Sequence, residues 1–232
     1  MEYIISDIHG YYDLFIKLLK KINFGKQDKM IIVGDIIDKG PDSIKLLKFV
    51  RQYDNFIFIV GNHEYEFLKY YHNVMKNTED NFDEKELLNK INDYFPDEKE
   101  KLDWEDIDWL ENCPYYYETD DYICVHAGIK LNENNEVINP KQNQVEYLVY
   151  DRHFKEPDVV VKNSKCVLYG HTPTRYLTDK DEIILYKRDE VDNPKSIRDY
   201  YKIHLDCGTY YSKKLGCFCA DNCNTYYIQK LA

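Results

Sequence analysis

The stretch MIIVGDIIDKG, from Met30 to Gly40, begins as a buried β-strand and ends in charged residues. Its first four residues are all apolar, which is the pattern of a strand covered on both faces in a parallel sheet. A glycine ends the apolar run, and Asp35, Asp38 and Lys39 follow. In open α/β sheets the ligand crevice lies at the C-terminal ends of the parallel strands. The stretch therefore predicts an α/β fold with a polar site just beyond this strand.

The segments on either side repeat the alternation of strand and helix. Apolar runs at 2–6 (EYIIS) and 55–60 (NFIFIV) predict two more strands. The segment 11–24 (YYDLFIKLLKKINF) has its apolar residues on one helical face, and 42–53 (DSIKLLKFVRQY) follows Pro41, a good residue for opening a helix. This order predicts a sheet with helices on both faces.

The rest of the chain divides into two predicted insertions and a series of strands. Residues from about 64 to 120 are highly charged and helical in pattern, and we predict a helical insertion there and a second, shorter insertion at about 141–163. We expect a largely antiparallel C-terminal part and a single domain over 1–232. Apolar runs predict further strands at 122–128, 165–172, 182–186, 201–208, 214–221 and 225–231.

Composition narrows the possible partners. The chain has 232 residues, of which 44% are hydrophobic, and its formal net charge is −11. This acidic balance argues against extended nucleic-acid binding, which normally relies on a basic face. The acidic balance does not argue against a phosphorylated substrate, because bound metal ions can reverse the sign of the local charge.

We expect a cytoplasmic protein without a membrane partner. No apolar run reaches the roughly eighteen residues of a membrane-spanning helix, and the first residues lack the pattern of a signal peptide. The seven cysteines, an odd number without a paired framework, fit a reducing compartment. We interpret Cys217, Cys219 and Cys223 as small hydrophobic residues, because no fourth zinc ligand follows at a suitable spacing. The sequence gives no indication of the oligomeric state.

Five apolar runs end in residues that can bind metal ions. Each end alone is more often an ordinary turn, but strands that share one sheet edge would bring all five together. Carboxylates, an Asn amide and imidazoles suit manganese, iron or zinc and need no thiolate. Asp7 and His9 could bind one ion, and Asp35 could bridge two ions about 3.5–4 Å apart. The five ends are Asp7–Gly10, Gly34–Asp38, Gly61–Glu64, His126–Gly128 and Gly170–Thr172.

In this order the five ends resemble the calcineurin-like metallophosphoesterases, and more narrowly the phosphoprotein phosphatases with their bacterial and phage members. The likeness also includes Lys39–Ser43, the segment DRHF (Asp151–Phe154) and the segment LDCG (Leu205–Gly208), and so it spans nearly the whole chain. The resemblance implies an α/β fold of a particular kind, a four-layer αββα sandwich of two mixed β-sheets flanked by helices.

The resemblance also implies a role for each candidate residue. His63 matches the family's general acid, and Asp38 matches the acid that orients it. Arg152 matches an arginine that binds phosphate oxygens. Lys39 stands where the family usually has arginine; it keeps the charge but loses the planar pair of donors, and a solvated turn lysine is the alternative. The implied ligands are Asp7, His9 and Asp35 for one metal ion, and Asp35, Asn62, His126 and His171 for the other.

The expected function is therefore hydrolysis of phosphate esters by in-line attack of a hydroxide that bridges two divalent metal ions, Mn²⁺ before iron or zinc. We expect a serine/threonine-type protein phosphatase, a phosphomonoesterase. The alternatives are a symmetrical diadenosine-tetraphosphate hydrolase or another nucleotide or RNA-end phosphoesterase. A non-catalytic binding module on this fold is a remote alternative, since no implied ligand is missing. Tyr115–Tyr117 could stack on a base, although packing is the simpler interpretation of these residues.

Overall fold

The computed structural model describes residues 1–78, 83–162 and 165–230. Four predicted segments reach beyond the described residues: the first insertion at 79–82, the second at 163, the last strand at 231, and the domain at all of 79–82, 163–164 and 231–232. The strands are β1 Glu2–Ile5, β2 Lys29–Val33, β3 Phe56–Ile59, β4 Tyr116–Glu118, β5 Tyr122–Val125, β6 Cys166–Tyr169, β7 Ile184–Lys187, β8 Tyr200–His204, β9 Lys214–Cys219 and β10 Thr225–Gln229. The helices are α1 Tyr12–Lys21, α2 Ser43–Arg51, α3 Asn62–Lys76, α4 Glu84–Asn92, α5 Trp104–Asn112, α6 Val145–Tyr150, α7 Arg175–Thr178 and α8 Thr209–Ser212, with 3₁₀ turns η1 Pro140–Gln142 and η2 Ile197–Asp199.

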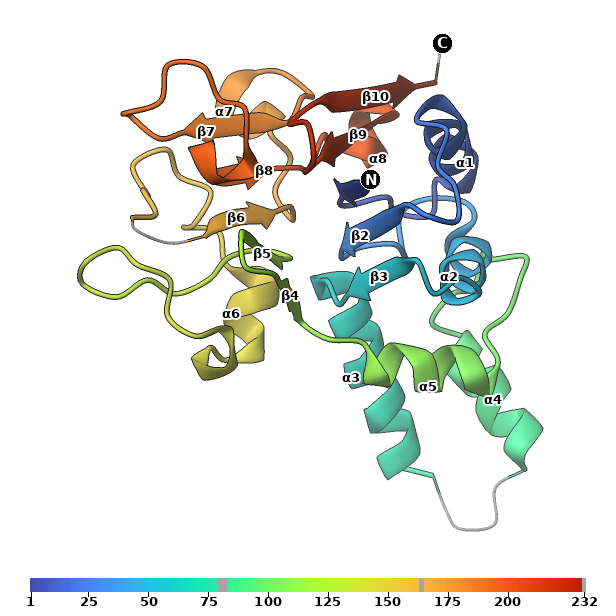
Figure 1. The fold of residues 1–232 in the computed structure, drawn as a ribbon. Coiled ribbons are helices and arrows are strands. Elements are labelled where there is room, and N and C mark those ends of the chain that lie inside the picture. The colour runs from blue at the N-terminus through green and yellow to red at the C-terminus, as the bar shows by residue number, and fades with distance from the viewer. Residues whose placement is uncertain (79–82, 163–164, 231–232) are drawn as a thin grey trace.

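Two five-stranded mixed sheets lie face to face, with helices on their outer faces (Figure 1). Sheet A has the order β10-β9-β1-β2-β3, and sheet B has the order β4-β5-β6-β8-β7. Helices α1 and α2 cover the outer face of sheet A, and α6 packs on sheet B. The predicted αββα sandwich is confirmed.

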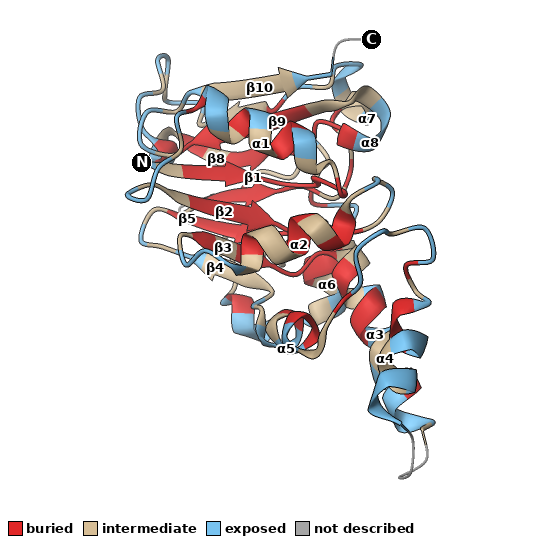
Figure 2. Ribbon diagram, turned by 90° about the vertical axis from the view of Figure 1, so that its right-hand side faces the viewer, coloured by how far each residue is buried: buried red, intermediate tan, exposed pale blue. Residues whose placement is uncertain are grey.

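The alternation of side chains along each strand produces these layers. In β1 and β2, Ile4 and Ile31 point into the core between the sheets, while their neighbours Ile5 and Ile32 pack against the helices. The central strands are therefore buried on both sides, as Figure 2 shows, and this explains their unbroken apolar sequences.

The helical region after β3 differs from a simple insertion. Helix α3 begins at Asn62, within a predicted metal-binding segment, and so belongs to the framework of the site. Two ion pairs connect α5 to α2. The buried Asp106 of α5 pairs with Lys48 of α2 at 2.6 Å and with Arg51 of α2 at 3.0 Å. The region ends in the short strand β4, which pairs antiparallel with β5 and was not predicted. The domain assignment itself stays a prediction.

One further expectation is confirmed and another needs correction. The C-terminal part is largely antiparallel, because β7 pairs antiparallel with β8, and β9 pairs antiparallel with both β1 and β10; the exception is β8, which pairs parallel with β6. The second predicted insertion is helical only in η1 and α6, and the rest of its described residues form turns and irregular structure. Because β8 runs parallel to β6, the end of β8 lies at the same sheet edge as the ends of β5 and β6, and this edge carries the candidate site.

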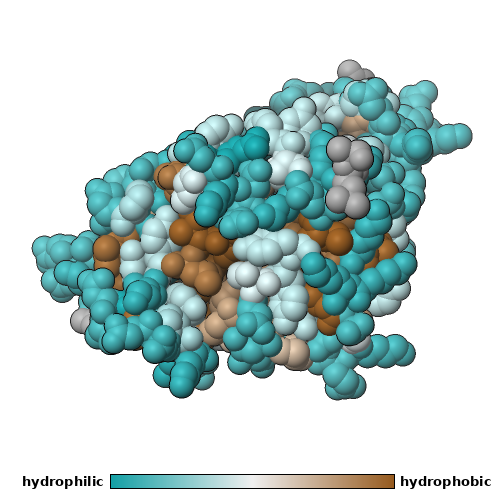
Figure 3. All heavy atoms as spheres, turned by 90° about the horizontal axis from the view of Figure 1, so that it is seen from above, coloured by the Kyte–Doolittle hydropathy of each residue, from teal (hydrophilic) through white to brown (hydrophobic). Residues whose placement is uncertain are grey.

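Two of the three C-terminal cysteines belong to the hydrophobic core. All seven cysteines are free, the side chains of Cys217 and Cys219 in β9 pack into the core, and Cys223 is half-buried. Seen from above, the surface is mostly hydrophilic, with hydrophobic residues gathered in patches near its middle (Figure 3). No helix among the described residues is long and apolar enough to cross a membrane.

Candidate metal centre

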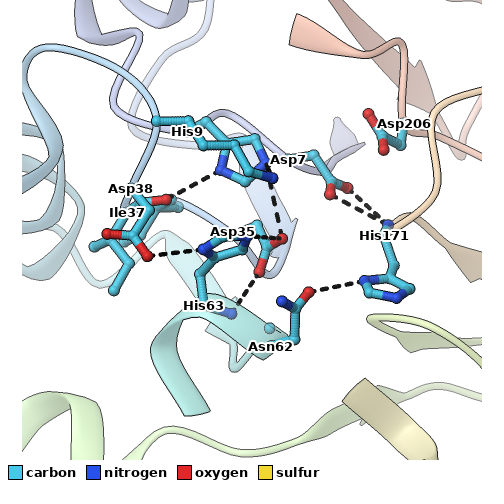
Figure 4. Close-up of polar contacts among 12 residues, drawn as sticks. Asp7, His9, Asp35, Ile37, Asp38, Asn62, His63, His171 and Asp206 are labelled. Carbon is cyan, nitrogen blue, oxygen red and sulfur yellow. Dashed lines mark hydrogen bonds and ion pairs between the residues drawn. The ribbon is translucent and has the colours of Figure 1, made fainter. Parts of the chain in front are cut away.

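The candidate metal ligands follow directly after strands of both sheets. Asp7 and His9 follow β1, Asp35 follows β2, and the other three predicted ligands follow β3, β5 and β6. Figure 4 shows Asp35 between two groups of side chains, with His9 on one side and His171 on the other. The structure thus brings the predicted ligands together, as the shared edge of parallel strands requires.

The backbone of the site is strained. Positive φ angles are uncommon for residues other than glycine, and they concentrate at functional sites where the surrounding structure holds them in place. Gly34 has a φ of 79° and also lies so close to His126 that a Cβ atom there would be 2.4 Å from the ring Nδ1. Only glycine fits at this position. The site residues with positive φ are Asp7 (51°), His9 (50°), Asp35 (55°), Asp38 (64°), Lys39 (66°) and His171 (70°).

Asn62 lies at the centre of one group of potential ligands. Its Oδ1 is 3.0 Å from Nε2 of His126 and 2.8 Å from Nδ1 of His171. Nε2 of His126 is also 3.4 Å from Oδ1 of Asp35. Ligand atoms of Asp35, His126 and His171 all lie within 4.8 Å of one another. This group matches the predicted second metal site.

A second group shares Asp35. The Oδ2 of Asp35 is 3.8 Å from Nε2 of His9 and 3.9 Å from Nε2 of His63. His9, Asp35 and His63 form the other set of described residues whose ligand atoms lie within 4.8 Å of one another. Asp7, predicted as a ligand here, is nearby, and its carboxylate accepts hydrogen bonds from the backbone N–H of His171 at 3.1 and 3.2 Å.

The histidines are oriented as metal ligands usually are. Ligating histidines typically donate their second ring N–H to a carbonyl or carboxylate, which fixes the tautomer. Nδ1 of His9 contacts the carbonyl of Ile37, and Nδ1 of His126 contacts the carbonyl of Val33, each at 3.0 Å. In both residues Nε2 is therefore left with its lone pair facing the other ligands.

The electrostatics of the site favour bound cations. Burial, with the charge of Lys39 next, lowers the pKa of His9 well below its ordinary value. Burial also lowers the pKa of His171 to about 2, and its Nε2 has no hydrogen-bond partner among the described residues. Burial raises the pKa of Asp35 well above its ordinary value. Neutral imidazoles and a desolvated carboxylate that converge in this way fit divalent cations.

The ring of His63 lies between the carboxylates of Asp38 and Asp35. Its Nδ1 is 2.8 Å from Oδ2 of Asp38, and its Nε2 points toward Asp35. Burial alone would lower the pKa of His63, but the hydrogen bond to Asp38 and the charge of Asp35 raise it above the ordinary value. The ring therefore keeps its proton more readily than a free histidine does.

Each of the two predicted phosphate-binding residues acts on a histidine of the site through its charge. Lys39 Nζ is 3.0 Å from Nε2 of His9, so a cation already occupies a position beside a predicted ligand atom. Arg152 is exposed, and its charge contributes to lowering the pKa of His171, after burial and His126. A cavity of about 230 Å³ opens beside Lys39 and Asp38.

Two buried acids near the metal ligands were given no role from the sequence. Glu64 accepts four backbone hydrogen bonds, from Gly61 and from the three residues Asp35–Ile37, at 2.9–3.1 Å. An acid three residues after the N-cap of a helix can accept the first backbone N–H, so the sequence could have indicated the contact with Gly61 but not those with Asp35–Ile37. Asp206 follows β8 and accepts from the N–H of Gly208 at 2.7 Å. Burial and the charge of Asp7 raise the pKa of Asp206 well above its ordinary value.

Comparison with known proteins identifies related chains. Residues 3–205 match the family model described as calcineurin-like phosphoesterase. A symmetrical bis(5′-nucleosyl)-tetraphosphatase of Wigglesworthia glossinidia brevipalpis is 36% identical over 151 residues, which cover 62% of this chain and 52% of that protein. The enzyme of the same name from Vibrio parahaemolyticus is 29% identical over 149 residues, which cover 63% and 52% of the two chains. The chain thus spans about half the length of the curated relatives it matches.

A solved structure supports the fold assignment. A metallophosphoesterase from Sphaerobacter thermophilus superposes with a TM-score of 0.59 at 15% identity, covering 98% of this chain and 88% of that one. At this level of identity the likeness concerns the fold alone.

Proposed function

The chain belongs to the calcineurin-like phosphoesterase family, and we propose that it hydrolyses the phosphoanhydride bond of bis(5′-nucleosyl) tetraphosphates. The observation that carries this proposal is the group of Asp35, Asn62, His126 and His171, in a chain whose curated relatives are named as symmetrical tetraphosphatases. Symmetrical cleavage of such a substrate would release two nucleoside diphosphates.

The proposed cofactor is a pair of divalent metal ions, Mn²⁺ in the first instance and iron or zinc as alternatives. Bound at this site, such ions would supply a water of lowered pKa and positive charge for the phosphoryl oxygens. Asp35 lies between the two groups of potential ligands and is the candidate bridge. The proposed ligands are Asp7, His9 and Asp35 for one ion, and Asp35, Asn62, His126 and His171 for the other.

The remaining charged residues bind and orient the substrate in this proposal. Arg152 presents a planar pair of donors to phosphate oxygens, and Lys39 adds a point charge beside His9. His63 holds a proton at Nε2, where it can pass to the leaving oxygen, and Asp38 keeps the ring oriented through Nδ1.

A second candidate is the phosphoprotein phosphatase reaction, and the contact between His63 and Asp38 favours it. The alkoxide of a serine or threonine is a far more basic leaving group than a nucleoside diphosphate, and it leaves readily only when an acid protonates it. A histidine held at 2.8 Å by a carboxylate is suited to that task.

One substrate panel distinguishes the two candidates. The purified chain would be assayed with added Mn²⁺ on bis(5′-adenosyl) tetraphosphate, a phosphoserine peptide, p-nitrophenyl phosphate and a 5′-triphosphorylated RNA. A kcat/KM for the dinucleotide at least tenfold above that for the peptide supports the first proposal. The reverse ratio replaces it with the second, and hydrolysis of none of these substrates contradicts both.

A further inference from the structure

Three segments that enter the metal centre continue into tyrosines at its rim. Tyr11 follows the segment of Asp7 and His9, Tyr176 follows His171, and Tyr210 and Tyr211 follow Asp206. Three of these rings are exposed, Tyr176 by 64%, Tyr211 by 52% and Tyr210 by 40%, whereas Tyr11 is partly buried against the core. We call Tyr11, Arg175, Tyr176, Tyr210, Tyr211 and Lys213 the tyrosine rim.

Cationic side chains contact the rings of Tyr11, Tyr210 and Tyr211. The guanidinium of Arg175 is 5.7 Å from the ring centre of Tyr211, and its Nε pairs with Asp181 at 2.9 Å. Lys213 Nζ lies 4.5 Å from the ring centre of Tyr11 and 5.0 Å from that of Tyr210. Cation–π contacts of this kind order the rings before any ligand arrives.

Backbone contacts join the rim to the metal centre. The N–H of Thr174 donates to the carbonyl of Asp206 at 2.9 Å, so the segment that carries Tyr176 lies against the segment that carries Tyr210. A Cβ atom on Gly208 would lie 3.3 Å from the side chain of Pro173. In Figure 4 the carboxylate of Asp206 lies on the same side of the site as His171 and Asp7. The rim therefore begins one short segment away from the candidate ligands.

The chemistry of the rim fits a nucleobase better than a peptide. Bases stack on exposed tyrosines whatever their identity, because every base has a π face, and nearby cations add to the attraction. The ammonium of Lys213 donates to the hydroxyl of Tyr11 and the carbonyl of Tyr210, and this places a positive charge among the rings that can attract a nucleotide's phosphates. The tyrosines Tyr115–Tyr117, considered for this role from the sequence, instead pack against the core beside β4.

We propose that the tyrosine rim stacks a nucleobase of the substrate, or of the nucleoside diphosphate product, beside the metal centre. This inference rests on the proposed function and adds to it, because it assigns the recognition of the nucleoside to named residues of this chain. The rim contributes to binding of the nucleoside and makes no contact with the reacting phosphorus, which lies at the metal centre.

The test compares substrates with and without a base. The double variant Tyr176→Leu/Tyr211→Leu removes two exposed rings, Tyr176→Phe/Tyr211→Phe keeps them, and Tyr53→Leu is the control because Tyr53 is 47% exposed and lies at the far end of α2. We expect the Leu double variant to raise KM for bis(5′-adenosyl) tetraphosphate by about 5- to 100-fold. Its kcat/KM for p-nitrophenyl phosphate, and both constants of the Phe and Tyr53 variants, should stay within about twofold of wild type.

Titration calorimetry with ADP separates this inference from the proposed function. Weaker binding of ADP by the Leu double variant supports the rim even if the wild-type chain does not cleave the dinucleotide. Unchanged KM and unchanged ADP affinity overturn the inference while leaving the proposed function intact. An equal loss on p-nitrophenyl phosphate, or a loss confined to a phosphoserine peptide, also overturns it.

Discussion

The carboxylate of Glu64 accepts the backbone N–H of Asp35 at 3.0 Å, so one buried acid positions another that is the candidate bridge between two metal ions. The same carboxylate accepts the N–H groups of Ile36, Ile37 and Gly61. It thereby joins the end of β2 to the end of β3 and supports a loop in which Asp35 has positive φ. Glu64 is a positioning residue, because it acts on the ligands through the backbone.

Replacement of Glu64 by Gln should therefore weaken both the fold and the site. The amide keeps one acceptor oxygen but turns an NH₂ group toward backbone donors, and hydrogen bonds to a charged group are worth about 1.5–3 kcal/mol each. We expect the free energy of unfolding in urea to fall by about 3 kcal/mol and the affinity for Mn²⁺ to fall about tenfold or more. Glu86→Gln, on the exposed surface of α4, is the matched control. Wild-type stability in Glu64→Gln would contradict this role.

Replacement of Asp35 by Asn should remove bound metal with little loss of fold. Asp35 is shared by both groups of potential ligands, and the amide has neither the charge nor the second oxygen needed for a bridge. Metal analysis of purified protein reconstituted with Mn²⁺ should find about two ions per chain in wild type and at most one in the variant. Circular dichroism checks the fold, and Asp54→Asn, at an exposed position, serves as the control. Two tightly bound ions in Asp35→Asn would exclude the bridging role.

Replacement of His63 by Gln should lower the rate of hydrolysis most for substrates with a basic leaving group. General acid catalysis is typically worth about 10²–10⁴-fold, and its loss matters most when the leaving oxygen is basic. We expect kcat to fall by about 10²-fold or more on a phosphoserine peptide and by clearly less on bis(5′-adenosyl) tetraphosphate. Both ions should remain bound, with His72→Gln, an exposed histidine, as the control. Loss of metal from His63→Gln would instead identify His63 as a ligand, as its place beside His9 and Asp35 allows.

Replacement of Asp38 by Asn should move the alkaline limb of the pH profile to lower pH. Burial lowers the pKa of His63, whereas Asp38 raises it, so removal of Asp38 leaves burial as the larger influence. If protonated His63 is the acid, kcat declines as the pH rises through the pKa of His63, and a lower pKa brings that decline to a lower pH. The profile of kcat between pH 5 and 9 tests this. Asp97→Asn, which removes a neighbouring acid from the same cavity, should leave the limb in place.

Much of this protein could be predicted from its sequence because the residues that end the parallel strands follow those strands directly in the chain. The apolar run before Gly34 and the polar residues after it are both local features, and so the α/β class and the set of candidate ligands could be deduced without coordinates. The likeness to a known family then supplied roles for His63 and Arg152.

The distances within the site depend on tertiary structure alone. Asp35 follows β2 of sheet A and His126 follows β5 of sheet B, and their approach to 3.4 Å requires the two sheets to pack with their polar edges aligned. The role of Glu64 was hidden because its four donors come from two segments about thirty residues apart in the chain, a pairing that no local pattern encodes. The parallel pairing of β8 with β6, an exception in the largely antiparallel C-terminal part, was not predicted, because strand partners are set by packing across the whole fold.

The tyrosine rim shows the same division. Tyrosine is abundant throughout this chain, so the sequence by itself gave no reason to single out Tyr176 or Tyr211. Their exposure follows from the short helices α7 and α8, which come after β6 and β8 and hold these rings outside the core. Residue identity at each strand end was determined by the sequence, whereas proximity and exposure were decided only when the two sheets packed together.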